Sequence, residues 1–166
     1  MMLPSGLKRL RLAVKDDHHY QALLPTLSSL LGRLPELRGL ELHVAAGQDA
    51  ALLRPLPDVR FLSLFVSGVK EAPVERTSRV VRALQSPRGY SRLLFPGALE
   101  CEEAFARLVE QLGREGVRLR EAGGVVASPR IDEGKAGRLE GLVRRELGCG
   151  FGALDEEAIW RLVPLS

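Results

Sequence analysis

The feature that most constrains the fold is a pattern that occurs twice in the first 66 residues. Residues 34–44 read LPELRGLELHV and residues 56–66 read LPDVRFLSLFV, so both follow Leu-Pro-acid-aliphatic-Arg-x-Leu-x-Leu-x-Val. A looser copy opens the chain with Leu3-Pro4 and continues through Leu7, Leu10 and Leu12. The alternation of aliphatic and other residues at the end of each copy predicts a β-strand. The recurrence predicts one structural unit that is used several times.

The rest of the chain continues this alternation of strand and helix signals. We expect strands over residues 7–14, 37–44, 59–66, 90–95 and 117–121, the last with a short extension at 125–126. We expect helices over residues 22–33, 77–85, 100–112 and 132–147, and a last helix that begins after Asp155. Strands that alternate with crossover segments predict a mainly parallel five-stranded sheet with helical crossovers, an α/β fold.

The aliphatic spacing within the strands has the form L-x-x-L-x-L, as in Leu37, Leu40 and Leu42. Over residues 1–66 the chain resembles leucine-rich-repeat regions of F-box-type scaffold proteins, and the resemblance implies a horseshoe-type arrangement and protein binding. The family places Asn or Cys three residues after the last core leucine. This chain instead has Lys15, Ala45, Ser67, Ala98 and Ala122 at those positions, so the repeat is degenerate.

A second arrangement fits the same strands. The first and fifth expected strands are amphipathic, as edge strands would be, whereas the third and fourth are apolar on both faces. Strands buried on both faces are typical of a three-layer, Rossmann-like α/β sheet. The two arrangements differ at Phe61 and Phe65: a horseshoe-type sheet exposes at least one of them, and a three-layer sheet covers both.

Length and composition limit the function classes. The chain has 166 residues, enough for a single α/β domain over 1–166, with the clearest repeats at 3–66, degenerate repeats at 86–147 and a C-terminal capping helix within 153–166. Its net charge is +3 and its aromatic content 5%, so binding to nucleic acid is not expected. Cys101 and Cys149 lie far apart, which favours a reducing, cytoplasmic location. We expect no membrane partner, no cofactor and no metal.

If the strands lie parallel and in register, the residues between their core aliphatics share one face. That face would hold the row Arg11, Glu41, Ser63, Leu94 and Arg118, and its content of arginine, aromatic and acid is typical of protein interfaces. We therefore expect a protein-binding scaffold or adaptor, with a partner of unknown identity or as one component of a larger assembly. The expected protein-binding residues are Arg11, Glu41, His43, Phe61, Ser63, Phe65, Arg118 and Arg120.

The alternative function is a small-ligand sensor or enzyme, with its site where parallel α/β sheets bind ligands, at the carboxyl ends of the strands. Its residues would be Asp16, Asp17, His18, Ser67, Gly68 and Gly97. Asp17 can equally serve as a helix cap in a solvated loop. The stretch at 148–152, GCGFG, follows a helix rather than a strand, so we expect a helix end and a turn there rather than a phosphate loop. We expect no catalytic residue.

Overall fold

The computed structural model describes residues 6–13, 29–44, 55, 58–66 and 74–162. Its sheet has six strands in the order β1-β2-β3-β4-β5-β6, and every neighbouring pair is parallel. The strands are β1 Arg9–Ala13, β2 Gly39–Val44, β3 Phe61–Val66, β4 Tyr90–Phe95, β5 Leu119–Ala127 and β6 Gly150–Ala153. The expected parallel α/β fold is thereby confirmed, with one strand more than the five predicted.

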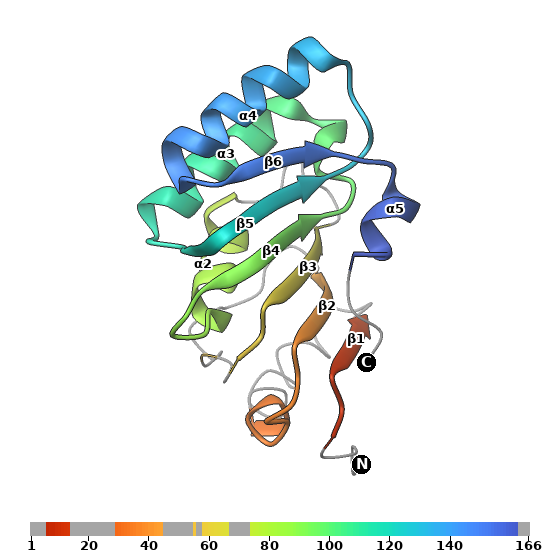
Figure 1. Ribbon diagram of the computed structural model, residues 1–166, viewed down its shortest axis with the longest axis vertical. Helices are drawn as coiled ribbons and strands as arrows, with labels where there is room; N and C mark the ends of the chain where they lie inside the picture. Colours follow the sequence, from red (N-terminus) through yellow and green to blue (C-terminus); the bar gives the residue numbers. More distant parts are fainter. Residues whose placement is uncertain (1–5, 14–28, 45–54, 56–57, 67–73, 163–166) are drawn as a thin grey trace.

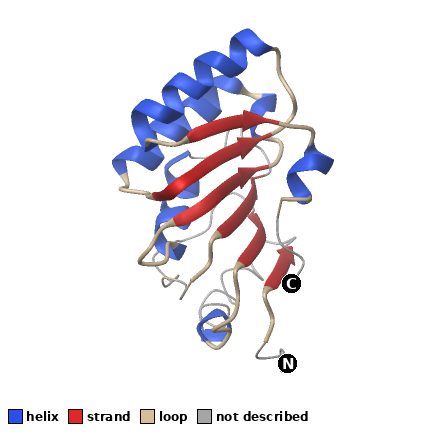
Figure 2. Ribbon diagram, viewed as in Figure 1, coloured by secondary structure: helices blue, strands red, loops and turns tan. Residues whose placement is uncertain are grey.

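The crossover helices lie on one side of this sheet (Figures 1 and 2). They are α2 Val74–Leu84, α3 Glu102–Arg114 and α4 Glu133–Leu147, and the short 3-10 helix η2, Ala98–Glu100, precedes α3. A fifth element, α5 Glu156–Trp160, lies apart from them, beside the carboxyl ends of the strands (Figure 1). A doubly wound sheet reverses its strand order between its two halves. The order seen here runs from β1 to β6 without any reversal.

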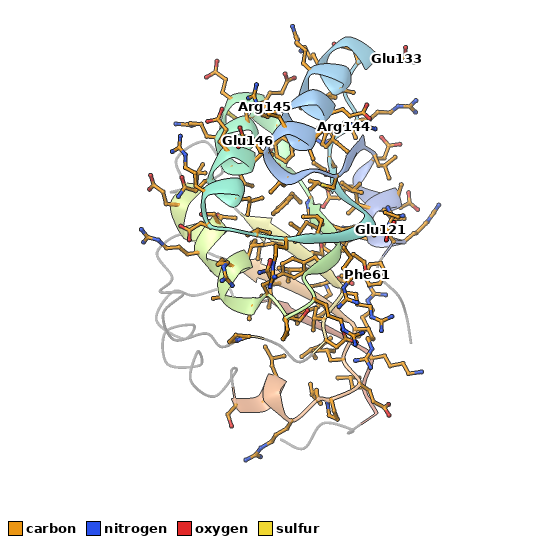
Figure 3. The ribbon with its side chains drawn as sticks, turned by 60° about the vertical axis from the view of Figure 1, so that its left-hand side comes forward. Phe61, Glu121, Glu133, Arg144, Arg145 and Glu146 are labelled. Atoms are coloured by element: carbon orange, nitrogen blue, oxygen red, sulfur yellow. The ribbon has the colours of Figure 1, made fainter. Side chains whose placement is uncertain are left out.

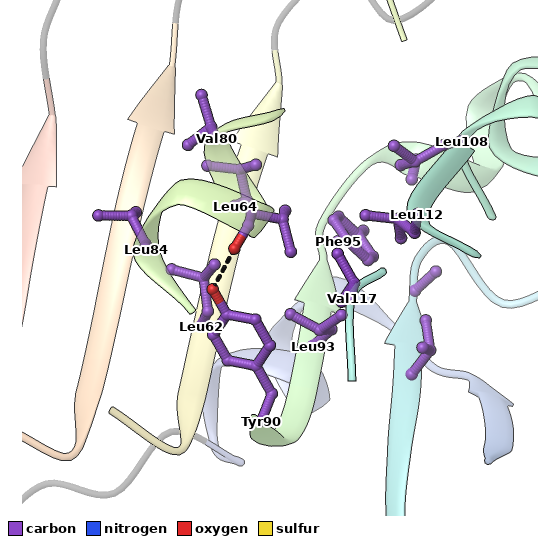
Figure 4. Close-up of a cluster of buried hydrophobic side chains, with 14 of the residues drawn as sticks. Leu62, Leu64, Val80, Leu84, Tyr90, Leu93, Phe95, Leu108, Leu112 and Val117 are labelled. Atoms are coloured by element: carbon purple, nitrogen blue, oxygen red, sulfur yellow. Dashed lines mark hydrogen bonds between the residues drawn. The ribbon is translucent and has the colours of Figure 1, made fainter. Parts of the chain in front are cut away.

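One apolar core fills the space between the sheet and these helices. Strands contribute every second residue, as in Leu62 and Leu64 of β3 and Leu93 and Phe95 of β4, and all four are buried. Helix α3 contributes Phe105, whose ring meets Phe95 edge-on at 6.3 Å between centroids. Figure 4 shows part of this core, including the hydrogen bond that the Tyr90 hydroxyl donates to the carbonyl oxygen of Val81. Burial of this apolar surface is the main stabilising contribution to the fold.

Three consecutive units begin with the same backbone arrangement. The carbonyl of Lys8 accepts from the amides of Arg38 and Gly39 at 2.8 and 3.0 Å. In the same way the carbonyl of Arg38 accepts from the amides of residues 60 and 61 at 2.9 and 3.0 Å, and the carbonyl of Arg60 from those of residues 91 and 92 at 2.7 and 3.0 Å. Positions 8, 38 and 60 are therefore structurally equivalent, as the sequence repeat predicted for 38 and 60.

The repeat becomes irregular in β5. A register shift against β4 separates the pair Tyr90–Leu119 from the pair Arg92–Gly124, and Ala122 within it has a φ of 60°. A Cβ on Gly123 would lie 2.7 Å from the carbonyl oxygen of Arg120, so only glycine fits there. The interruption expected between residue 121 and the extension at 125–126 is instead a bulge inside one long strand.

The chain after α4 also differs from the expectation. Gly148 ends α4 in a left-handed conformation with φ of 67°, as expected for a helix end. We expected only a turn after Gly148, but the next residues form β6. It pairs with β5 from Gly124↔Gly150 to Ala127↔Ala153. Glycine-rich segments carry weak strand signals because glycine lowers strand stability. Backbone pairing with β5 stabilises β6 as a strand although its own sequence has a low strand propensity.

Candidate functional site

The sheet has a second surface, opposite to α2, α3 and α4, which we call the strand face. Its residues alternate with those of the core, and the register aligns them across strands. One row runs Arg9, Gly39, Phe61, Arg92, Gly124 and Gly150, and the next runs Arg11, Glu41, Ser63, Leu94, Val126 and Gly152. Phe61 is partly exposed and Arg92 is exposed. In Figure 3, Phe61 and Glu121 lie on one side of the molecule, and Arg145 and Glu146 of α4 lie on another.

The second row is largely covered by the C-terminal segment. Ile159 of α5 packs against Leu94 and Val126 in a small apolar cluster separate from the main core. The ring of Trp160 lies 5.3 Å from the guanidinium carbon of Arg11, a cation–π contact that joins α5 to β1. Between these two contacts lie β2 and β3, whose Glu41 and Ser63 are fully buried. The open part of the strand face is therefore the first row and the amino-terminal ends of the strands.

Glu41 is a buried carboxylate held by arginines of the neighbouring strand. Arg9 donates from Nε to Glu41 Oε1 at 2.7 Å, and the Nε of Arg11 lies 3.7 Å from Glu41 Oε2. Oε2 itself accepts no hydrogen bond. A buried charge costs free energy unless it is paired, so the pairing with Arg9 and Arg11 is what allows Glu41 to be fully buried.

Asp58 lies among three arginines at the amino-terminal ends of the strands. Its carboxylate accepts from Arg120 Nη2 at 2.6 Å and from Arg60 Nη2 at 3.2 Å, and the Nε of Arg38 is 3.6 Å away. Burial acts to raise the pKa of Asp58, but the hydrogen bonds from Arg120 and Arg60 and their charges outweigh it, so the pKa is lowered. One negative charge thus meets three positive ones, and the Nε of Arg60 is buried without a hydrogen bond.

Sequence reasoning placed some of the expected protein-binding residues correctly and misplaced others. Arg11, Glu41, Ser63 and Leu94 do form one row, as predicted. The prediction that this row is exposed is wrong for Glu41, Ser63 and Leu94, which are all buried, and Leu94 packs against Ile159 of α5. The backbones of His43 and Phe65 pair in β2 and β3, and their side chains lie outside the described part of the structure.

Arg118 is not a member of the row. It precedes β5, its amide donates to Gln85 Oε1 at 2.6 Å and its guanidinium donates to the carbonyl of Pro87 at 3.0 Å. The residue that continues the row in β5 is Val126. The error came from aligning the unit on Leu119, which ignored the bulge that moves the regular part of β5 toward its end. Arg120 does lie at the strand face, through its bond to Asp58.

The alternative ligand residues lie mostly outside the described residues: Asp16, Asp17, His18, Ser67 and Gly68. Gly97, at the carboxyl end of β4, is described and has a φ of 78°. Its amide donates to the hydroxyl oxygen of Ser128 at 2.7 Å. That donor is therefore used within the fold, where it fixes the turn between β4 and η2.

Cysteine and metal chemistry find little support among the described residues. Cys149 is buried, and burial raises the pKa of its thiol to about 11 although a backbone hydrogen bond at Val125 opposes this. A thiol with a raised pKa is a poor nucleophile at neutral pH. Within the described parts of the chain, no three side chains of His, Cys, Asp or Glu gather as a metal site would require.

Comparison with protein-family models, with curated proteins and with solved structures gives no match for the chain. The resemblance to leucine-rich repeats accordingly stays a prediction from the sequence. Among the helices that the structure describes, none combines the length and the apolar character needed to cross a membrane.

The most densely charged part of the strand face was missed by sequence reasoning. Arg38, Arg60 and Asp58 belong to the repeat motif, and Arg92 lies in a strand that was expected to be apolar on both faces. The signal was present in the motif itself, because both copies place an acid two residues before an arginine. The sequence indicated Arg120 as a residue of this face but not its pairing with Asp58, from which it is 62 residues away along the chain.

Proposed function

We propose that this chain is a protein-binding module and that its strand face receives the partner. The observation that carries the proposal is the division of the sheet: α2, α3 and α4 lie over one surface, whereas the amino-terminal part of the other has Phe61 partly exposed among arginines. Aromatic residues and arginine are enriched in protein interfaces, where an aromatic anchor supplies most of the apolar contact.

The arginines around Phe61 suit this role because their positions are fixed. Asp58 orients Arg38, Arg60 and Arg120, and Glu41 orients Arg9. Side chains that are already ordered lose less conformational entropy when a partner binds. An aromatic side chain surrounded by pre-oriented cations is therefore suited to recognise a specific surface.

The test uses the full-length chain and one variant on each side of the sheet. Immobilised wild-type protein is incubated with cell extract, and any retained protein is identified by mass spectrometry, purified and titrated by calorimetry. We expect Phe61→Glu to abolish this binding while the melting temperature stays close to that of the wild type. The matched control is Arg107→Glu, at an exposed position of α3, and it should bind normally.

Two outcomes would contradict the proposal. The first is a purified partner that binds Phe61→Glu as tightly as it binds the wild type, which would place the interface elsewhere. The second is loss of the fold in Phe61→Glu and also in the milder Phe61→Ser, which would make Phe61 a core residue. Circular dichroism of each variant separates the two outcomes.

A further inference from the structure

Positive charge is concentrated at the amino-terminal part of the strand face. The proposed function leaves the chemistry of the partner open, and this charge bears on it. We define the basic patch as Lys8, Arg9, Arg11, Arg38, Arg60, Arg92 and Arg120. The described acids beside it are Glu36, Glu41, Asp58 and the exposed Glu121 of the β5 bulge. Seven positive charges and four negative ones leave a charge of +3 on the patch, which equals the net charge of the whole chain.

The basic patch follows from the repeat and is not a random scatter of arginines. Positions 8, 38 and 60 are equivalent by their shared carbonyl hydrogen bonds, and each holds a lysine or arginine. Neighbouring strands lie about 4.8 Å apart. The patch therefore extends about 19 Å from β1 to β5, a length that matches about six residues of an extended peptide.

Part of this charge has no anion within the described structure. Asp58 supplies one carboxylate for three arginines, and 43% of the Arg60 side chain is exposed. Arg92 is exposed, and among the described residues no hydrogen bond or ion pair involves its side chain. Lys8 is exposed as well. The patch thus has capacity for further negative groups next to Phe61.

We propose that the basic patch binds an extended acidic segment of the partner protein, with carboxylates facing Arg92 and the arginines around Asp58 and an apolar side chain on Phe61. This inference rests on the proposed function and specifies its partner. Asp58 already shows the chemistry, because it is a carboxylate bound by three of these guanidinium groups. Arginine binds carboxylates with charge-assisted, directional hydrogen bonds.

The same observations favour a protein segment over a nucleic acid. The patch is a single band of side chains across five strands, whereas specific DNA interfaces bury about 1,000 Å² or more of protein surface. Phosphate backbones are bound through many freely accessible cations, and here Glu41 and Asp58 already occupy several of the arginines. A partly exposed Phe61 among them suits a peptide that alternates acidic and apolar residues.

The experiment measures binding of the full-length chain to a fluorescein-labelled short peptide of alternating glutamate and leucine, by fluorescence anisotropy. The reference probe has glutamine in place of glutamate. We expect the glutamate peptide to bind at least about tenfold more tightly, and its affinity to fall as salt is raised from about 0.1 M to about 1 M because the charges are screened.

The variant arm uses Arg92→Glu, which touches no described ion pair. It should weaken binding of the glutamate peptide about tenfold or more, because a charge reversal replaces attraction by repulsion. The matched control Arg107→Glu changes the net charge equally on the helical side and should stay within about twofold of the wild type. Arg92→Gln serves as a second variant if Arg92→Glu fails to fold, with an intermediate loss expected.

Several outcomes would overturn the inference. They are absence of peptide binding up to the solubility limit, equal affinity for the two peptides, equal effects of Arg92→Glu and Arg107→Glu, or tighter binding of a DNA duplex with the same sensitivity to Arg92→Glu. Self-association that Arg92→Glu abolishes would assign the patch to a second copy of the chain instead. If a purified partner needs Phe61 but the acidic peptide does not compete for it, the proposed function stands and the acidic partner is wrong.

Discussion

The same strands present different kinds of side chain on the two surfaces of the sheet. On the surface under α2, α3 and α4, consecutive strands present leucine, valine and phenylalanine to a continuous apolar core. On the strand face the same strands present Arg9, Glu41, Ser63 and Arg92. Stabilising apolar contacts are concentrated on one surface, which leaves the other free to hold charged groups and the buried atoms without hydrogen bonds, Glu41 Oε2 and Ser63 Oγ. Measurements on matched pairs of residues can test this division.

The largest effect is expected for aromatic residues on the two surfaces. Phe105→Ala should lower the free energy of unfolding by about 3–5 kcal/mol, because its ring is fully buried against Phe95 and Phe151 and a cavity would remain. Phe61→Ala should lower it by less than about 1.5 kcal/mol, because that ring is partly exposed. Chemical denaturation followed by circular dichroism measures both. Equal losses would show that the strand face is a second core.

An intermediate effect is expected at the buried ion pair of the strand face. Arg9→Leu should lower the free energy of unfolding by about 2–3 kcal/mol, below the usual loss for fully buried pairs because 21% of the Arg9 side chain is exposed. It leaves Glu41 buried with only the distant Arg11. Glu41→Gln removes the buried charge instead and should cost less.

The double variant that combines Arg9→Leu with Glu41→Gln tests why Arg9→Leu lowers the stability. If the cost of Arg9→Leu comes from the stranded carboxylate, adding Glu41→Gln should restore part of the lost stability. Additive losses in urea denaturation would mean that the two side chains act independently.

The smallest effect is expected at Asp58 and depends on pH. Asp58→Asn should lower the free energy of unfolding by about 0.5–1 kcal/mol at neutral pH, since its carboxylate is partly exposed. The pKa of Asp58 is lowered below 3.8 in the folded state. A lowered pKa stabilises the fold above the pKa of the unfolded chain, and this contribution disappears as the pH falls through the folded-state pKa.

Wild type and Asp58→Asn should therefore differ in stability at pH 6, begin to converge below about pH 4 and meet only below the folded-state pKa of Asp58. Denaturation curves across this pH range measure the difference. If the difference in the free energy of unfolding persists in acid, the hydrogen bonds of Asp58 stabilise the fold without requiring its negative charge. Glu121→Gln, at an exposed acid outside the Asp58 cluster, is the matched control.

The sequence predicted the helical side of the sheet better than the strand face. The leucine spacing located β2, β3 and β4 to within two residues, and Asp132 and Asp155 do begin α4 and α5. Such local signals depend on neighbours along the chain. Coverage of Leu94 depends on Ile159 of α5, more than 60 residues away, and the arginines of Asp58 come from three separate strand regions. Long-range contacts of this kind leave no periodic signal in the sequence.

The bulge explains the remaining errors. Counting the fifth unit from Leu119 placed Arg118 on the strand face, because a regular spacing cannot reveal additional residues within a strand. The glycines at 123 and 124 indicated an interruption, and the interruption is real, but the hydrogen bonding to β4 resumes after it. β6 escaped prediction for a related reason, because two of its four residues are glycine.

Helix α5 changes how such an array of strands unfolds. In a linear stack each unit contacts only its neighbours, so the stack can fray from either end. Here Ile159 binds β4 and β5 while Trp160 contacts Arg11 in β1, which ties the last element of the chain to the first strand. Detaching β1 must break a contact with the opposite end of the sequence. The short helix thereby couples the two ends, and the six strands should lose their structure together in a single cooperative transition rather than one after another.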